Sequence, residues 1–212
     1  KIIDLGGFRY RQTMSSMTGR LSDNPLYLAA HWQFTPPQGP ERARKAAQYL
    51  RVIRDLAINP RWVGLSDQGA DCSSALDWIA AHIGTINREL NGILQEGLDC
   101  FHPEQRTDTQ VFAAPILAKA GIDGFCNLSV RPVTLIVDPG RVLRTDWPKL
   151  VIHELAHSMA RSAGHENNFR LALTHLCLAF DLPEPPSDAV DLLQRWPPYR
   201  ANGNRAKFWH LT

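Results

Sequence analysis

The 212-residue sequence predicts an α+β fold in which a small mixed β-sheet packs on one functional helix, with additional scaffold helices around them. Two observations predict the helices: apolar residues recur every three or four positions in the first half of the chain, and again between residues 147 and 162. A third observation predicts the sheet, because short β-prone runs bounded by turn residues lie between residues 110 and 138. This mixture of helical and strand segments is typical of the α+β class.

Two long helices are expected before the sheet. Residues 41–57 contain few helix-breaking residues and collect their apolar side chains on one side, which predicts an amphipathic support helix with a basic outer face. Residues 73–97 begin at the capping pair Ser73-Ser74 and end near Gly97, which predicts a long buried scaffold helix. The apolar positions of the two segments are Ala47, Leu50, Ile53, Leu56, Ala57, Ile79, Ile83, Ile86, Leu90, Ile93 and Leu94.

Three strands are expected in the middle of the chain. Residues 133–138 are strongly β-prone and end at the turn signal Pro139-Gly140. Residues 124–130 are the predicted hairpin partner of this strand, and residues 110–114 form a third strand. The result is a small mixed sheet.

The functional helix is predicted over residues 147–162. Asp146 or Thr145 is a suitable N-cap, Pro148 is tolerated in a first turn, and Gly164 is a natural residue just beyond the helix end. Apolar residues also recur at i and i+4, which predicts a stripe facing the core. These residues are Trp147, Val151, Leu155 and Met159.

This helix carries the pattern His153-Glu154-Leu155-Ala156-His157. Because an α-helix has about 3.6 residues per turn, His153 and His157 project from the same face, one turn apart, and can reach one metal ion. Glu154 lies one step round, where it can hold and deprotonate a water at the metal without being a ligand. The alternative is that both histidines are ordinary helical residues, one packed and one solvated.

A catalytic zinc site takes three protein ligands and leaves the fourth position for water, so a third ligand is needed. His165 is the leading candidate, because it follows Gly164 and precedes residues 166–173, which form a second predicted helix. A glycine turn lets the chain fold back and present His165 to the first helix. Glu166 is the adjacent rival, and the remaining alternative is that His165 is only a polar residue at a helix start. Weaker rivals further along the chain are Asp181 and Glu184.

The segment HELAHSMARSAGHENNF, residues 153–169, resembles the active-site segment of SprT-like and WLM-type zinc metallopeptidases. Those proteins carry HExxH, a short spacer, then Gly and His followed by an aromatic residue. The resemblance implies a zincin-like fold and a zinc-dependent hydrolase that cleaves peptide bonds of a protein or peptide substrate. The residues it assigns are the Zn²⁺ ligands His153, His157 and His165, the general base Glu154, and Phe169 packed behind the third ligand.

The resemblance covers under a tenth of the chain and has two departures. Glu166 follows the third histidine where the SprT-like pattern commonly has Gly, and no cysteine pairs are present for an attached zinc ribbon. In zincins, the strand before the active-site helix commonly borders the cleft and pairs with an extended substrate. That expectation falls on residues 133–138, for which a plain core strand is the alternative.

Residues near the C-terminus supply further candidates. The aromatic residues Trp196, Phe208 and Trp209 predict that the tail docks onto the body, because disordered tails are poor in aromatics. Four residues are candidates for stabilising the oxyanion of a hydrolysis reaction. They are Tyr199, Arg170, His175 and Arg195.

Composition limits the other function classes. A net charge of +2 indicates neither nucleic-acid binding nor a membrane surface, and no apolar run approaches the roughly 20 residues of a transmembrane helix. No signal peptide is visible, and four scattered cysteines without CxxC spacing favour a cytoplasmic, reducing compartment. A secreted protein with one disulfide is the alternative. Residues 1–40 are expected to form a peripheral N-terminal arm, and residues 41–212 a single metallopeptidase-like domain. Oligomeric state and substrate identity are not predicted.

A competing class is a non-enzymatic zincin-fold binding or regulatory module with a structural zinc. A hydrolase of non-peptide amides would share the catalytic site and differ in the shape of its cleft. The coordination sphere separates structure from catalysis, because a fourth protein ligand closes a structural site, whereas a position open to a groove permits chemistry.

Overall fold

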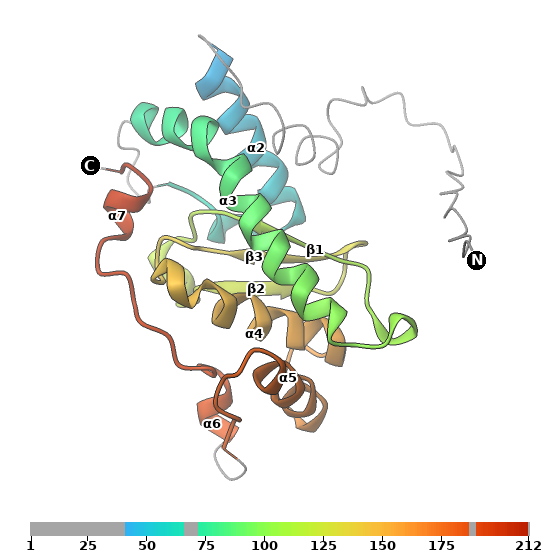
Figure 1. Ribbon diagram of the computed structural model, residues 1–212. Coiled ribbons are helices and arrows are strands. Elements are labelled where there is room, and N and C mark those ends of the chain that lie inside the picture. The colour runs from blue at the N-terminus through green and yellow to red at the C-terminus, as the bar shows by residue number, and fades with distance from the viewer. Residues whose placement is uncertain (1–40, 66–71, 187–189, 212) are drawn as a thin grey trace, which may run out of the picture.

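A computed structural model of the chain describes residues 41–65, 72–186 and 190–211. In this part, six α-helices accompany a three-stranded mixed sheet, so the α+β prediction is confirmed (Figure 1). The expected arm of residues 1–40 lies outside the described residues. The helices are α2 (Arg42–Leu56), α3 (Ser73–Asp99), α4 (Trp147–Ala160), α5 (Asn167–Ala179), α6 (Val190–Leu193) and α7 (Arg205–Phe208). Short 3-10 turns are η3 (Pro60–Trp62), η4 (Pro103–Gln105), η5 (Ala118–Ala120) and η6 (Arg144–Asp146).

The two predicted scaffold helices, α2 and α3, are confirmed and pack against each other on one side of the sheet (Figure 1). Most of their apolar positions are buried, with Leu50, Ile53, Ile79 and Ile83 between 0% and 2% exposed. Ala47, which was expected on the apolar side of α2, is exposed instead. The N-cap of α3 is Cys72, so the expected capping pair falls in the first helical turn instead.

The three predicted strands are present, but their order changes which strand is accessible. They are β1 (Thr109–Ala113), β2 (Gly124–Asn127) and β3 (Val133–Val137), in the order β1-β3-β2. Strand β3 runs parallel to β1 and antiparallel to β2, and all five of its residues are buried. The expectation that residues 133–138 pair with a substrate is therefore wrong, because both edges of β3 are already paired. Strands β1 and β2 form the two edges of this sheet.

Helix α4 covers the other face of the sheet, and α5 packs on α4 (Figure 1). Helix α4 ends at Ala160, earlier than predicted, because Arg161 and not Gly164 takes the left-handed position after the helix, at φ 51°. The Ser162 N–H donates to the carbonyl of His157 at 3.3 Å. Gly97 of α3 permits a close approach to α4, because a Cβ there would lie 2.6 Å from Cδ2 of Leu155. The helix that carries the histidines is thus held between the sheet, α3 and α5.

The start of α4 is tied to the C-terminal tail. Asp146 occupies the N-cap position as predicted, but its side chain does not cap the helix. Its Oδ2 instead accepts hydrogen bonds from the backbone N–H of Arg200 at 2.9 Å and from Nε of Arg200 at 3.1 Å. Lys149 Nζ lies 3.2 Å from Oδ1 of the same carboxylate. These contacts join the tail to the first turn of α4.

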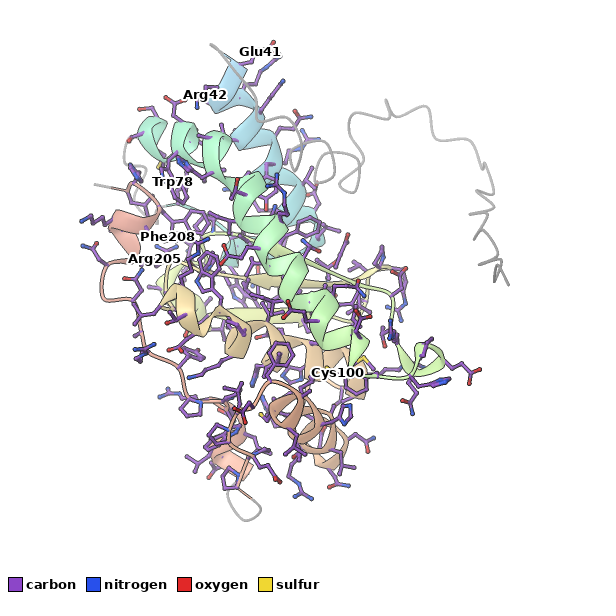
Figure 2. All side chains as sticks on the ribbon, in the orientation of Figure 1. Glu41, Arg42, Trp78, Cys100, Arg205 and Phe208 are labelled. Carbon is purple, nitrogen blue, oxygen red and sulfur yellow. The ribbon has the colours of Figure 1, made fainter. Side chains whose placement is uncertain are left out.

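The predicted docking of the aromatic tail is confirmed. The Trp209 side chain is 0% exposed, and its Nε1–H donates to Oδ1 of the buried Asp138 at 2.7 Å. Trp78 of α3 meets Phe208 and Trp209 edge-on, with ring centroids 5.2 Å and 5.6 Å away. Figure 2 shows Trp78 and Phe208 on neighbouring elements, with Arg205 nearby. The tail is therefore anchored at its far end, beyond the segment that passes α4.

The cysteines are not joined by disulfide bonds. All four are free; Cys126 and Cys177 are buried, and Cys72 and Cys100 are partly buried. Among the helices that the structure describes, none combines the length and the apolar character needed to cross a lipid bilayer.

Replacing Trp209 with Ala should lower the free energy of unfolding by about 3–5 kcal/mol, because a fully buried indole is lost and Asp138 loses a donor. Chemical denaturation monitored by circular dichroism measures this change. Leu178→Ala, at a side chain 59% exposed on α5, is the control and should change stability by less than about 0.5 kcal/mol. Equal effects of the two substitutions would contradict the anchoring role of Trp209.

Stability should also depend on ionised Asp146. Burial alone would raise the pKa of this carboxyl, but hydrogen bonds from Arg200 and the Lys149 ammonium lower the pKa from 3.8 to about 2. The lowered pKa contributes about 2 kcal/mol above pH 4, and this contribution disappears as the pH falls from about 4 to about 2. Urea unfolding of wild type and Asp146→Asn across this range should show a stability difference that closes in acid. A difference in stability that does not change with pH would show that ionised Asp146 is not its cause. Asp55→Asn, at an exposed position on α2, is the control.

Candidate metal centre

The structure brings the three predicted imidazoles together. Helix α4 presents His153 and His157 one turn apart, with ring centroids separated by 5.2 Å. His165 lies in the turn before α5, and its ring centroid is 5.4 Å from that of His153 and 4.8 Å from that of His157. One nitrogen from each ring lies within 4.8 Å of the other two. The three rings can therefore hold one metal ion.

The spacing of two of the nitrogens fits a metal ion closely. Nε2 of His165 lies 3.5 Å from Nε2 of His153. Two nitrogens bound at about 2.0–2.1 Å to one tetrahedral ion are separated by about 3.3 Å. Little movement is therefore needed for both rings to bind the same cation.

Backbone carbonyls orient the two helical rings. Nδ1 of His153 lies 2.7 Å from the carbonyl oxygen of Trp196, and Nδ1 of His157 lies 2.9 Å from that of Ser162. A carbonyl only accepts hydrogen bonds, so each Nδ1 carries the proton and each Nε2 has a free lone pair. Metal-binding histidines are commonly fixed in this way, because the outer hydrogen bond sets both the tautomer and the ring plane.

The three rings are held in the neutral form that binds metals. Burial lowers the pKa of His153 to about 3, and the neighbouring rings add to this effect despite the hydrogen bond to Trp196. Burial likewise lowers the pKa of His157 to about 4 and lowers the pKa of His165. All three lone pairs are therefore available at neutral pH.

The Phe169 ring of α5 packs against all three imidazoles. Its side chain is 0% exposed, and its ring centroid lies 5.2, 4.3 and 4.6 Å from those of His153, His157 and His165. The expected packing of Phe169 behind the third histidine is confirmed, and the contact extends to all three rings.

The turn that carries His165 is held by local hydrogen bonds. Ser162 Oγ donates to Oε2 of Glu166 at 2.7 Å, and the Gly164 N–H donates to Ser162 Oγ at 3.1 Å. A Cβ at Gly164 would meet the Glu166 carboxylate, so a larger residue there would push this flexible side chain out of its hydrogen bond with Ser162. Glu166 stabilises the turn and is not a member of the three-residue cluster, which favours His165 over its rival. Within the described part of the chain, Asp181 and Glu184 do not join the cluster either.

Glu154 lies on α4 directly beside the histidine face and is 5% exposed. Burial, and then the nearby Asp123 carboxylate, raises the pKa of Glu154 to about 8. The edge strand leaves room for this side chain, because a Cβ on Gly124 would lie only 2.9 Å from Oε1 of Glu154. The carboxylate is thus placed between the histidines and the backbone of β2.

A cavity of about 690 Å³ opens onto these side chains. Its walls come from α4, the edge strand β2, the segment around η3, and the C-terminal tail. The lining residues are Ile58, Trp62, Gly121, Ile122, Asp123, Gly124, Phe125, Cys126, Leu150, His153, Glu154, His157, Ala163, His165, Gln194, Arg195, Pro198 and Tyr199.

Two of the four candidates for oxyanion stabilisation line the cavity, and two do not. Tyr199 and Arg195 line it, whereas Arg170 donates to Oδ1 of Asn167 on the α5 surface and His175 lies 2.8 Å from the carbonyl oxygen of Cys100. The Tyr199 hydroxyl donates to Oδ2 of Asp123 at 2.6 Å. Its proton is therefore directed to Asp123, and burial together with this carboxylate raises the pKa of Tyr199.

Sequence reasoning identified the imidazoles and Glu154 but missed the groups around them. The carbonyls of Trp196 and Ser162 carry no signal, because every residue has such an acceptor. Asp123 and Gly124 were detectable only as the residues at the start of a predicted strand. Their closeness to Glu154 depends on tertiary packing.

No protein-family model matches the chain, and comparisons with curated proteins and with solved structures find no match either.

Replacing His165 with Ala should weaken zinc binding by more than about 100-fold, because second-shell changes alone cost about 10–100-fold and this change removes a ligand. Competition with a chromophoric chelator measures the affinity. The matched control is His175→Ala, at a histidine of α5 that contacts the Cys100 carbonyl and lies outside the cluster. Zinc affinity equal to wild type in the His165 variant would exclude His165 as a ligand.

Proposed function

We propose that this protein is a zinc-dependent metallopeptidase with a zincin-type active centre. The observation that carries the proposal is the convergence of three neutral imidazoles beside a buried glutamate in an open cavity. An ordinary pair of helical histidines would have no reason to meet a third ring, with two Nε2 atoms 3.5 Å apart.

Zinc is the metal that suits this donor set. Three imidazole nitrogens with no carboxylate among them are unlike the all-oxygen sites that select magnesium or calcium. Three histidines with a fourth position left for water are a recurring arrangement of catalytic zinc. Bound zinc would polarise the scissile carbonyl and lower the pKa of the attacking water.

Residues of the chain would bind the metal, orient two of the imidazole rings and transfer the proton. His153, His157 and His165 hold the metal, and the Trp196 and Ser162 carbonyls fix two of the rings. Glu154 would take the proton of the attacking water as general base and return it to the leaving amine as general acid. The positive charge of the bound metal would lower the raised pKa of Glu154 and so favour the ionised form that the first step needs. The place of Glu154 beside the histidine face, on the cavity wall, puts the carboxylate where such a water would lie.

The edge strand β2 offers a way to bind an extended peptide. The carbonyl of Asp123 accepts from the Asp138 N–H at 2.7 Å, which marks this residue pair as hydrogen-bonded in the antiparallel ladder. Because hydrogen-bonded and non-hydrogen-bonded pairs alternate, the backbone groups of Gly124 and Cys126 face away from β3. Both residues line the cavity, so a substrate backbone could add as a further strand beside Glu154.

A structural zinc site is less well supported. A closed site needs a fourth protein ligand, and among the residues that the structure describes no cysteine or carboxylate joins the three rings. The cluster also faces a cavity large enough for several peptide residues. Both features favour catalysis over a purely structural metal.

Glu154→Gln should keep zinc bound while lowering peptide turnover by at least about 100-fold, because the amide cannot accept the proton of the attacking water. Zinc content by elemental analysis and hydrolysis of a mixed protein substrate test both parts. Glu104→Gln is the control, since this glutamate side chain is 90% exposed and lies outside the cavity.

Turnover by the Glu154→Gln protein equal to that of wild type would remove Glu154 from the mechanism. Zinc binding without any hydrolysis by wild type would instead favour a structural or regulatory role for the metal.

A further inference from the structure

One wall of the cavity is apolar and lies apart from the histidines. Ile58 and Trp62 come from the segment after α2, and Phe125 comes from β2. Trp62 and Phe125 meet edge-on, with ring centroids 5.6 Å apart at 71°. Ile58 is 52% exposed although it faces a cavity. We name Ile58, Trp62 and Phe125 the apolar wall.

The apolar wall lies on the opposite side of β2 from Glu154. Successive side chains of a strand point to opposite faces, and Gly124 is the residue that approaches Glu154. Phe125 therefore points to the other face, where it meets Trp62. Asn127 has the same parity and donates to the carbonyl of Leu56, the last residue of α2, at 2.8 Å. The cavity thus extends around the free edge of β2 from one face to the other.

This arrangement determines where the side chains of a bound peptide would lie. In an antiparallel pair, residues directly opposite each other project to the same face of the sheet, and the same holds for parallel neighbours at equivalent positions. A peptide residue beside Phe125 would project onto Trp62 and Ile58. The residues before and after it would project toward the face that carries Glu154 and the histidines.

The charged side chains of the cavity offer no partner to a peptide side chain bound on the apolar wall. Asp123 is occupied, because its Oδ2 accepts from the Tyr199 hydroxyl at 2.6 Å and its Oδ1 lies 3.6 Å from Nε of Arg141. Arg195 belongs to the tail, next to Pro198 and Tyr199 on the cavity lining, and is exposed. A charged peptide side chain on the apolar wall would lose water without gaining a partner, whereas a large apolar side chain would cover Ile58 and Trp62.

We propose that the cavity selects extended peptides carrying a large apolar or aromatic side chain at one position close to the scissile bond, where it packs on the apolar wall. This inference rests on the proposed peptidase function and names the substrate class for the same site. Selection at a single position follows from strand pairing, because alternate residues face the metal centre instead.

Cleavage of a mixed peptide library by the zinc-loaded full chain, with sites mapped by mass spectrometry, tests the selection. One position beside the cleaved bond should show Phe, Leu, Ile, Met or Trp at least about tenfold more often than Ala, Asp or Lys. Equal frequencies of all side chains at every position would overturn the inference while leaving the proposed peptidase function intact.

Two substitutions tie the preference to the apolar wall. Trp62→Ala should reduce kcat/KM for the preferred peptide by about tenfold while leaving kcat/KM for its Ala-substituted counterpart nearly unchanged. Ile58→Asp changes a half-exposed side chain, so it should fold, and it should shift the preferred residue toward Lys or Arg. Leu171→Ala, at a side chain 57% exposed on α5, is the control and should keep the wild-type preference. A preference unchanged in both wall variants would overturn the assignment.

A binding measurement separates selection from turnover. Fluorescence anisotropy with the Glu154→Gln protein and labelled peptides that differ only at the selected position should give a dissociation constant about tenfold lower for Phe than for Ala or Lys. If this preference appears but wild type cleaves no peptide, the proposed function fails and the selectivity stands. If wild type cleaves peptides and the dissociation constants are equal, the selectivity fails alone.

Discussion

The geometry of the histidine cluster depends on two hydrogen bonds that hold imidazole rings to backbone carbonyls. His153 is held by Trp196, from a tail 43 residues further along the chain, and His157 by Ser162, from the turn that ends its own helix. Without these acceptors either ring could protonate the wrong nitrogen or rotate away from the metal. The rings stay neutral because they are buried, and burial is tolerable because each proton has a partner.

This dependence explains why distant parts of the fold matter to the site. The tail that supplies the Trp196 carbonyl is fastened to the first turn of α4 through Asp146 and Arg200, and to the core through Trp209 and Asp138. Helix α4 is itself fixed by close packing on α3 at Gly97. The two scaffold helices and the C-terminal tail therefore act together as the support of one histidine cluster and one glutamate.

Much of the architecture was predictable because it follows from local periodicity. The helices, the three strands and the pairing of the two histidines on α4 each depend on spacing within one segment, and the position of His165 between two predicted helices made it the leading candidate for the third ring. Strand order was not predictable in the same way: residues 133–138 look like a substrate-binding strand in sequence, yet they occupy the centre of the sheet. The partners of Glu154 and Tyr199 also escaped, since Asp123 reaches both only through tertiary packing.

The central claim is that three imidazoles bind one zinc ion and leave a position open for chemistry. X-ray absorption spectroscopy at the zinc edge of the metal-loaded protein tests it most directly, because imidazole rings give a distinctive scattering pattern and sulfur ligands lie about 0.2–0.3 Å further from zinc. We predict three imidazole nitrogens and one oxygen from water at about 2.0–2.1 Å. A spectrum with fewer than three imidazoles, or with a fourth protein ligand such as a thiolate, would contradict this account.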